Sequence, residues 1–124
     1  MDVSKLVYHG SNKHQIENNS VVFYSESKLF ASGYGNVTEH NIEIIDIFDT
    51  GNKEHVEDLL SKVGYLFDGY SKQEFETWQE YEAANLIASD TWETFEDHIN
   101  LIKGMRYNGM IIYEGGYKNY IVFM

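Results

Sequence analysis

Strand-like and helix-like segments fall into separate blocks of this sequence, and few folds are compatible with that separation. Short apolar runs bounded by turn residues occur before residue 46 and again after residue 109, while helical periodicity fills the stretch between them. A regular alternation of strands and helices would predict a parallel α/β sheet. The block pattern instead predicts an α+β fold, in which helices are inserted between the N-terminal and the C-terminal strands.

The strands are expected in segments rich in β-branched and aromatic residues. They are residues 5–9, 21–24, 37–46, 110–113 and 120–124. Residues 114–119 (E-G-G-Y-K-N) join the last two of these as a hairpin-like connection, and residues 49–52 (D-T-G-N) form a turn. The sheet therefore draws on both ends of the chain.

The helices are expected mainly in the middle of the chain. Val56, Leu59, Leu60 and Val63 recur at helical spacing, which predicts an amphipathic helix over residues 53–63. The remaining segments with helical character are residues 27–34, 75–87 and 91–104. Ser27 is the expected cap of the first of these, and Asp90 or Thr91 that of the last. Residues 64–70 are expected to be a connection without regular structure.

Composition adds limits on partners and compartment. With 124 residues the chain is expected to be a single domain, 1–124, and its net charge of −11 opposes direct binding to nucleic acid. The chain has no cysteine, which excludes a disulfide framework and a cysteine-based zinc site. No secretory signal and no apolar run long enough to span a membrane is visible, so we expect a cytoplasmic protein without a membrane partner.

The common catalytic motifs are absent. The sequence has no GxxxxGK[ST], GxGxxG, HExxH or GxSxG pattern, and its five histidines show no metal-ligand spacing. Trp78 and Trp92 are expected to belong to helix faces in the core. A second regional feature is charge, because residues 73–102 contain eight acidic residues and no Lys or Arg. That stretch is either a solvated helix surface or a docking face for a basic partner.

Three segments far apart in the sequence combine residues suited to a shared ligand site. Residues 8–11 (Y-H-G-S) place an imidazole and a bare backbone at a strand end, where the glycine lets a planar ligand approach closely. Residues 23–34 (F-Y-S-E-S-K-L-F-A-S-G-Y) lead from an aromatic strand into a short helix. Residues 109–124 (G-M-I-I-Y-E-G-G-Y-K-N-Y-I-V-F-M) carry a carboxylate at the end of an apolar strand, beside two glycines.

Together these segments resemble the three motifs of the mono-ADP-ribosyltransferase-like superfamily, and they occur in the family order. The family includes diphtheria-type toxins, poly-ADP-ribose polymerases and many phage-encoded members. The last segment also resembles the end of phage anti-CRISPR ADP-ribosyltransferases. The motifs touch about a third of the chain and span nearly all of it. The resemblance implies a split β-sheet core of the ADP-ribosyltransferase type.

The resemblance also implies roles for individual residues with NAD as the cofactor. His9 would bind the adenine-side ribose, and the backbone of Gly10 would bind the nicotinamide carboxamide. Phe23 and Tyr34 would flank the nicotinamide ring. Glu114 would be catalytic, orienting the nicotinamide ribose and stabilising the positive charge that develops as nicotinamide leaves.

The sequence departs from the family pattern at several positions. Phe23 stands where many members have Tyr, and Ile112 stands where the toxin branch has the first of two acids separated by one residue. In the polymerase branch the acid directly precedes the last strand, and there this chain has Asn119. Two alignments therefore stay open. Either Glu114 is the catalytic acid, or Asn119 occupies the acid position and the domain binds without catalysis.

The resemblance implies an NAD-dependent mono-ADP-ribosyltransferase that modifies a protein side chain, encoded by a phage or a mobile element. The expected partner is a host protein with a basic surface, such as a CRISPR surveillance complex, because an acidic domain favours a basic target. The alternative is an acidic inhibitor that occupies a basic nucleic-acid-binding groove without chemistry. A third reading is an NAD glycohydrolase.

Overall fold

A computed structural model describes residues 3–11, 21–33 and 36–123, and its fold is α+β, as the sequence predicts. The strands are β1 (Val3–Ser11), β2 (Val21–Ser25), β3 (Asn36–Ile44), β4 (Ile47–Asp49), β5 (Leu66–Asp68), β6 (Gln73–Phe75), β7 (Gly109–Glu114) and β8 (Tyr117–Phe123). The helices are α1 (Lys28–Ser32), α2 (Lys53–Val63), α3 (Trp78–Ala83), α4 (Trp92–Phe95) and α5 (Ile99–Gly104), with 3-10 turns η1 (Leu86–Ala88) and η2 (Glu96–His98).

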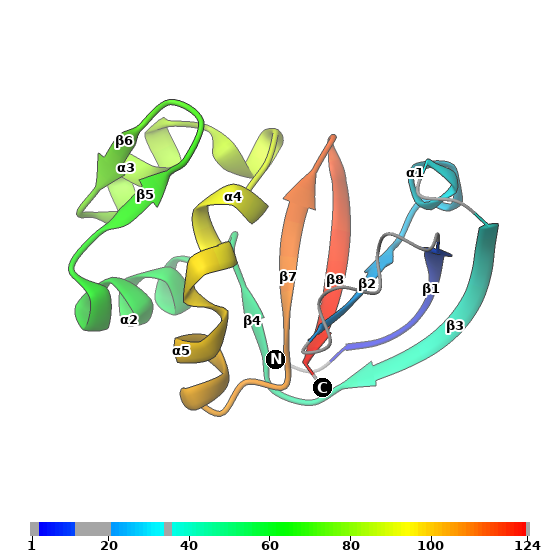
Figure 1. Cartoon of the computed structure of the whole chain (residues 1–124). Coiled ribbons are helices and arrows are strands. Elements are labelled where there is room, and N and C mark those ends of the chain that lie inside the picture. Colours follow the sequence, from blue (N-terminus) through cyan, green and yellow to red (C-terminus); the bar gives the residue numbers. More distant parts are fainter. Residues whose placement is uncertain (1–2, 12–20, 34–35, 124) are drawn as a thin grey trace.

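A mixed six-stranded sheet has the order β3-β1-β2-β8-β7-β4. All neighbouring pairs are antiparallel except β4 and β7, which are parallel. The sheet is formed by strands from both ends of the chain, as the block pattern of the sequence predicts. Helices α2 to α5 and the small β5–β6 hairpin lie on one side of β4, β7 and β8, whereas β1, β3 and helix α1 lie on the other (Figure 1).

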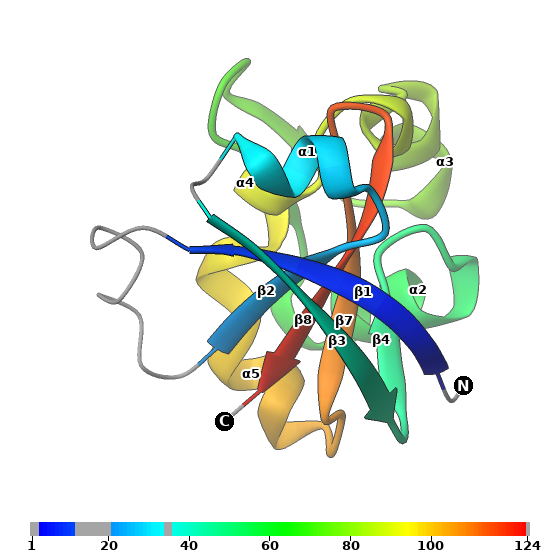
Figure 2. The same ribbon diagram turned by 90° about the vertical axis from the view of Figure 1, so that its right-hand side faces the viewer.

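Strands β1 and β3 cross over the strands β8 and β7 at a large angle (Figure 2). The sheet is therefore strongly bent. Because side chains alternate along β7 and β8, these strands contribute residues to two separate cores, one on each face. Met110, Ile112 and Ile121 point to the helices, while Ile111 and Tyr120 point to β1 and β3. We call these two faces the helix side and the β1–β3 side of the sheet.

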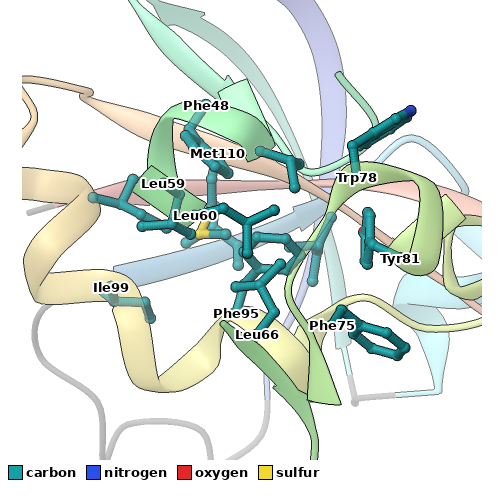
Figure 3. Packing of buried hydrophobic residues seen from close by; sticks show 14 residues of the cluster. Phe48, Leu59, Leu60, Leu66, Phe75, Trp78, Tyr81, Phe95, Ile99 and Met110 are labelled. Carbon is teal, nitrogen blue, oxygen red and sulfur yellow. The ribbon is translucent and has the colours of Figure 1, made fainter. Parts of the chain in front are cut away.

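The core on the helix side is the larger of the two and is rich in aromatic rings (Figure 3). Phe48, Tyr81 and Phe95 are fully buried in it and stack in tilted or edge-to-face pairs. Helix α2 closes this core with Val56 and Leu59, on the face that its periodicity predicts. The core on the β1–β3 side is aliphatic around Val7, Ile44 and Ile47. Both cores hold β7 and β8 in place from opposite sides.

The sequence-based prediction is wrong for the segment in which the short strand β4 occurs. Residues 37–46 were expected to be one strand, but Asp46 has a left-handed φ of 57° and the chain bends into β4. Asn108 fixes this bend, since its backbone N–H donates to the carbonyl of Asp46 and its side chain donates to that of Ile45. Strand β4 then pairs with β7, a long-range contact without a local sequence signal.

The expected connection 64–70 and the expected helix 75–87 also differ from the structure. Leu66–Asp68 and Gln73–Phe75 form the antiparallel β5–β6 hairpin, and a helix begins only at Trp78. The expected helix 91–104 is divided into α4, η2 and α5. None of the helices within the described residues is long and apolar enough to cross a membrane.

Candidate functional site

His9 lies where β1 separates from β2. The β1–β2 ladder pairs Tyr8 with Ser25. Next to that pair, the His9 ring forms a hydrogen bond with the backbone of β2. Its Nδ1 lies 2.8 Å from the carbonyl oxygen of Phe23. A carbonyl can only accept, so Nδ1 donates, and in the neutral ring the lone pair is therefore on Nε2. The imidazole thus links the two strands in place of a regular backbone bond.

The ring of His9 belongs to the β1–β3 side. Its centroid lies 5.6 Å from the ring of Tyr24 and 6.2 Å from that of His40 on β3. Thr38 lies between the two histidines, with its Oγ1 2.7 Å from His40 Nε2 and donating to the His9 carbonyl at 3.4 Å. This small aromatic cluster is packed beside the aliphatic core.

Phe23 points to the opposite side of β2. Its ring meets Trp92 of α4 edge to face, with centroids 4.9 Å apart, and 37% of its surface is exposed. Strand neighbours alternate between the two faces, which explains why Phe23 and Tyr24 separate in this way. The structure therefore joins His9 and Phe23 through the backbone, but places their rings on opposite sides of β2.

The structure says less about Gly10 and Tyr34, the other two proposed contacts to NAD. Gly10 is buried in β1, where it pairs with Val37 of β3. Tyr34 lies outside the described residues. Ser25, which the sequence analysis did not select, is buried beside Tyr8, and its Oγ accepts a hydrogen bond from the backbone N–H of Ser27 at 3.1 Å.

Asn119 lies on β8 between Ser25 of β2 and Ile112 of β7. The alternation along β8 puts its side chain on the helix side, as it does for Ile121. Only 3% of Asn119 is exposed, and its Oδ1 is buried without a hydrogen-bond partner. Such an unsatisfied acceptor costs about 1–3 kcal/mol unless a donor is brought to it. Thr94 Oγ1 of α4 is the other buried side-chain atom without a partner among the described residues.

Glu114 ends β7 and faces the same side of the sheet as Asn119. Asn119 pairs with Ile112, so Glu114 is its diagonal neighbour on the adjacent strand. Diagonal neighbours of this kind are typically about 7–8 Å apart between their Cα atoms. An isolated backbone bridge with Asp90 continues the sheet beside Glu114. The two candidates for the acid position are therefore close together, and the residues on this face form a set: Phe23, Ser25, Trp92, Glu114 and Asn119.

The β7–β8 hairpin that carries Glu114 is held by α1 and the residues before it. The backbone N–H of Lys118 donates to Glu26 Oε1 at 3.1 Å, and the backbone N–H of Glu26 donates to the Lys118 carbonyl at 3.2 Å. The ring of Phe30 on α1 lies 5.6 Å from that of Tyr117. Ser27 caps α1 by accepting from the Phe30 N–H, as its position in the sequence predicts. The second and third motif segments therefore fix one another.

A buried polar network next to this face was not foreseen. Tyr113 donates to Asp49 Oδ1 at 3.1 Å, and Thr50 Oγ1 lies 2.9 Å from Thr91 Oγ1 and donates to the carbonyl of Ile111. Burial, followed by the negative charge of Asp49, raises the pKa of Tyr113 far above its ordinary value. Residues 49–52 suggested only a turn. The threonines come together through long-range strand pairing, for which the sequence has no local signal.

Trp92 was expected to be a core residue, and it does pack against the larger core. Its additional contact with Phe23 joins segments that are distant in the chain, so no spacing rule predicts it. Within the described residues no group of three or more His, Asp or Glu side chains is arranged to hold a metal ion. Comparison of the chain with protein-family models, curated proteins and solved structures finds no match.

Proposed function

We propose that this protein is an NAD-dependent mono-ADP-ribosyltransferase that binds the nicotinamide end of NAD on the helix side of β2, β8 and β7. One observation carries the proposal. The three motif segments come to lie on β1, β2 and the β7–β8 hairpin, and β1, β2 and β8 are direct neighbours in the sheet. Phe23, Asn119 and Glu114 then share one face, although they come from opposite ends of the sequence.

Each residue of this face supplies a group that the reaction needs. Phe23 and Trp92 offer ring surface for the planar nicotinamide. The unpartnered Oδ1 of Asn119 accepts a hydrogen bond from a carboxamide N–H or a ribose hydroxyl. The carboxylate of Glu114 provides the negative charge that an oxocarbenium-like ribose requires. The ring of His9 lies on the opposite side of β2 from these residues, and its bond to the Phe23 carbonyl fixes β2 beside β1.

In the proposed reaction the glycosidic bond between ribose C1′ and the nicotinamide nitrogen breaks, and its electron pair leaves with nicotinamide. A nucleophilic side chain of the acceptor protein forms the new bond to C1′ and gives its proton to solvent. Stacking of the leaving ring and a fixed carboxylate next to the ribose lower the barrier without a redox step. The acceptor we propose is a host protein with a basic surface, such as a CRISPR complex.

The test is transfer of label from biotinylated NAD to protein in a bacterial lysate. We expect a labelled band with the unmodified protein and a loss of about a hundredfold or more in rate with Glu114→Gln. Glu43→Gln removes an equal charge from an exposed position on β3 and is the matched control. A Glu114→Gln variant with the transfer rate of the unmodified protein would contradict the assignment of the acid.

A second candidate function is stoichiometric inhibition by the acidic surface. It is favoured by the run of residues 73–102, which has eight acidic residues and no cation. Inhibition of the target at a one-to-one ratio in the absence of NAD, unaffected by Glu114→Ala, would support this function over the transferase. A requirement for NAD together with a mass increase on the target would exclude it.

A further inference from the structure

The β5–β6 hairpin exposes aromatic rings on a surface where polar residues would be expected. Leu66 and Phe75 point into the larger core, so the opposite face of the hairpin carries Tyr65 and Phe67. Both rings are exposed, Phe67 by 40%, and Tyr70 in the connecting turn is exposed by 78%. Three large rings within six residues form an unusual surface, and aromatic side chains are enriched in protein interfaces.

The turn that presents Tyr70 is fixed by hydrogen bonds. The Asp68 carboxylate accepts from the Tyr70 N–H at 2.9 Å and from the Ser71 hydroxyl at 2.5 Å. Burial alone would raise the pKa of Asp68, but these hydrogen bonds outweigh it and lower the pKa, which keeps the group ionised. Tyr70 therefore sits on a defined turn, which reduces the entropy lost when a partner binds.

Carboxylates border the rings. Glu74 pairs directly with Phe67 across the hairpin, and a carboxylate oxygen of Glu93 lies 3.6 Å from where a Cβ on Gly69 would be. Burial and then the nearby charges of Glu93, Asp97 and Asp90 raise the pKa of Glu96, so several carboxylates lie close together next to Glu93. From residue 63 to residue 102 the chain has a single cation, Lys72.

We propose that Tyr65, Phe67 and Tyr70, with Glu74 and Glu93, form a docking surface for an arginine-bearing segment of a partner protein. A guanidinium group stacks on aromatic faces and pairs with carboxylates, so both features of the surface favour it over lysine. The net charge of −11 opposes a second copy of this chain, a nucleic acid or an anionic membrane as the occupant. In the transferase the surface would select the acceptor protein. This last statement rests on the proposed function, whereas the binding of an arginine-bearing segment does not.

The test measures binding of a short fluorescent arginine-rich peptide by anisotropy, at physiological ionic strength and without NAD. We expect the triple variant Tyr65→Ser, Phe67→Ser, Tyr70→Ser to bind about tenfold or more weakly. Leu29→Ser removes an exposed apolar side chain from α1 and should leave the affinity unchanged. Binding by the folded triple variant at the affinity of the unmodified protein would overturn the proposal.

Two further comparisons separate the surface from net charge. Glu74→Gln with Glu93→Gln should weaken binding more than Glu39→Gln with Glu43→Gln, which removes the same charge from β3 on the far side of the molecule (Figure 1). Replacing the arginines of the peptide by lysine should weaken its binding to the unmodified protein severalfold. Equal affinities in either comparison would overturn the proposal. Because NAD is absent, neither outcome depends on transferase activity.

Discussion

Asn119 combines deep burial with an acceptor that no group of the described residues satisfies. Evolution tolerates such a group most readily where a ligand supplies the missing donor, because the unliganded protein carries the desolvation penalty alone. In the present account the donor is a carboxamide or hydroxyl of NAD. The residue should therefore lower the stability of the free protein and increase the stability gained from the ligand.

Asn119→Leu tests this trade-off. Leucine has a similar size and no polar atom, so we expect the free variant to be more stable to unfolding by about 1 kcal/mol. NAD should raise the Tm of the unmodified protein and leave that of the variant unchanged. Thermal unfolding with and without NAD measures both effects. A variant that is less stable and still gains stability from NAD would show that Asn119 is only structural.

At the residue scale, the sequence predicts on which strand and face a residue lies, but it predicts less well which residues that side chain contacts. Alternation alone places Phe23 and Tyr24 on opposite faces, and the structure agrees. The partners of these rings, Trp92 and His9, depend on how distant strands and helices pack. Glu114 and Asn119, the two candidates for the acid position, are diagonal neighbours in the structure, which their places in the sequence do not show.

At the scale of single elements, the β7–β8 hairpin controls where Glu114 sits. Glu114 and Tyr117 pair across a two-residue turn, and both turn glycines have positive φ, 61° at Gly115 and 81° at Gly116. This is the backbone geometry that two-residue hairpins favour. The sequence predicts a hairpin here, but the expected connection of residues 114–119 is too long, because Glu114 belongs to β7 and residues 117–119 belong to β8. A Cβ at Gly115 would lie 3.1 Å from the ring of Phe30, whereas one at Gly116 would meet nothing.

Gly115→Ala should therefore destabilise the protein more than Gly116→Ala. Both variants carry the cost of a positive φ, about 1–2 kcal/mol, but only the first also displaces Phe30 and with it α1. Denaturant unfolding measures the difference, and transfer activity should decrease further in Gly115→Ala because Glu114 moves. Equal free energies of unfolding for the two variants would contradict this description of the hairpin.

The junction between β4 and α2 should respond to pH. His55 Nδ1 accepts a hydrogen bond from the Asp49 N–H at 2.9 Å, and burial lowers the pKa of its imidazole despite the opposing charge of Asp49. The unfolded chain then binds the proton more readily than the folded one. This part of the stability is present at neutral pH and is lost as the pH falls below about 6.5.

His55→Asn keeps an acceptor near the same place but does not titrate. We expect the decrease in the free energy of unfolding between neutral and mildly acidic pH to be smaller in this variant. It should not vanish, because burial also lowers the pKa of His98. Denaturant unfolding across that pH range gives the slopes. A variant slope equal to that of the unmodified protein would show that His55 does not contribute.

Elements with a long periodic pattern were predicted well and short ones were not. Helix α2 matches its expected range, and β1, β2, β7 and β8 appear within a few residues of theirs. Strands β4, β5 and β6 have only three residues each, too few for a periodic signal, and they exist because a partner strand pairs with them. The hydrophobic pattern of residues 75–87 continues across β6 and α3, since both bury residues in one core.

At the scale of the whole molecule, both proposed surfaces belong to the helix side of the sheet. The motif face of β2, β8 and β7 carries the proposed NAD site, and the β5–β6 hairpin carries the proposed docking surface. The sequence predicts the α+β class and the joining of both chain ends in one sheet. It does not predict the crossing of β1 and β3 over the other strands, which depends on packing between two cores (Figure 2).

The most direct test of the central claim is a calorimetric titration of the protein with NAD. We predict one saturable binding event, weakened about tenfold or more by Phe23→Ala because nicotinamide loses a stacking surface. Ile45→Ala removes an exposed apolar side chain between β3 and β4 and should bind NAD like the unmodified protein. A titration without heat, or a folded Phe23→Ala variant of unchanged affinity, would contradict the claim that NAD binds this face.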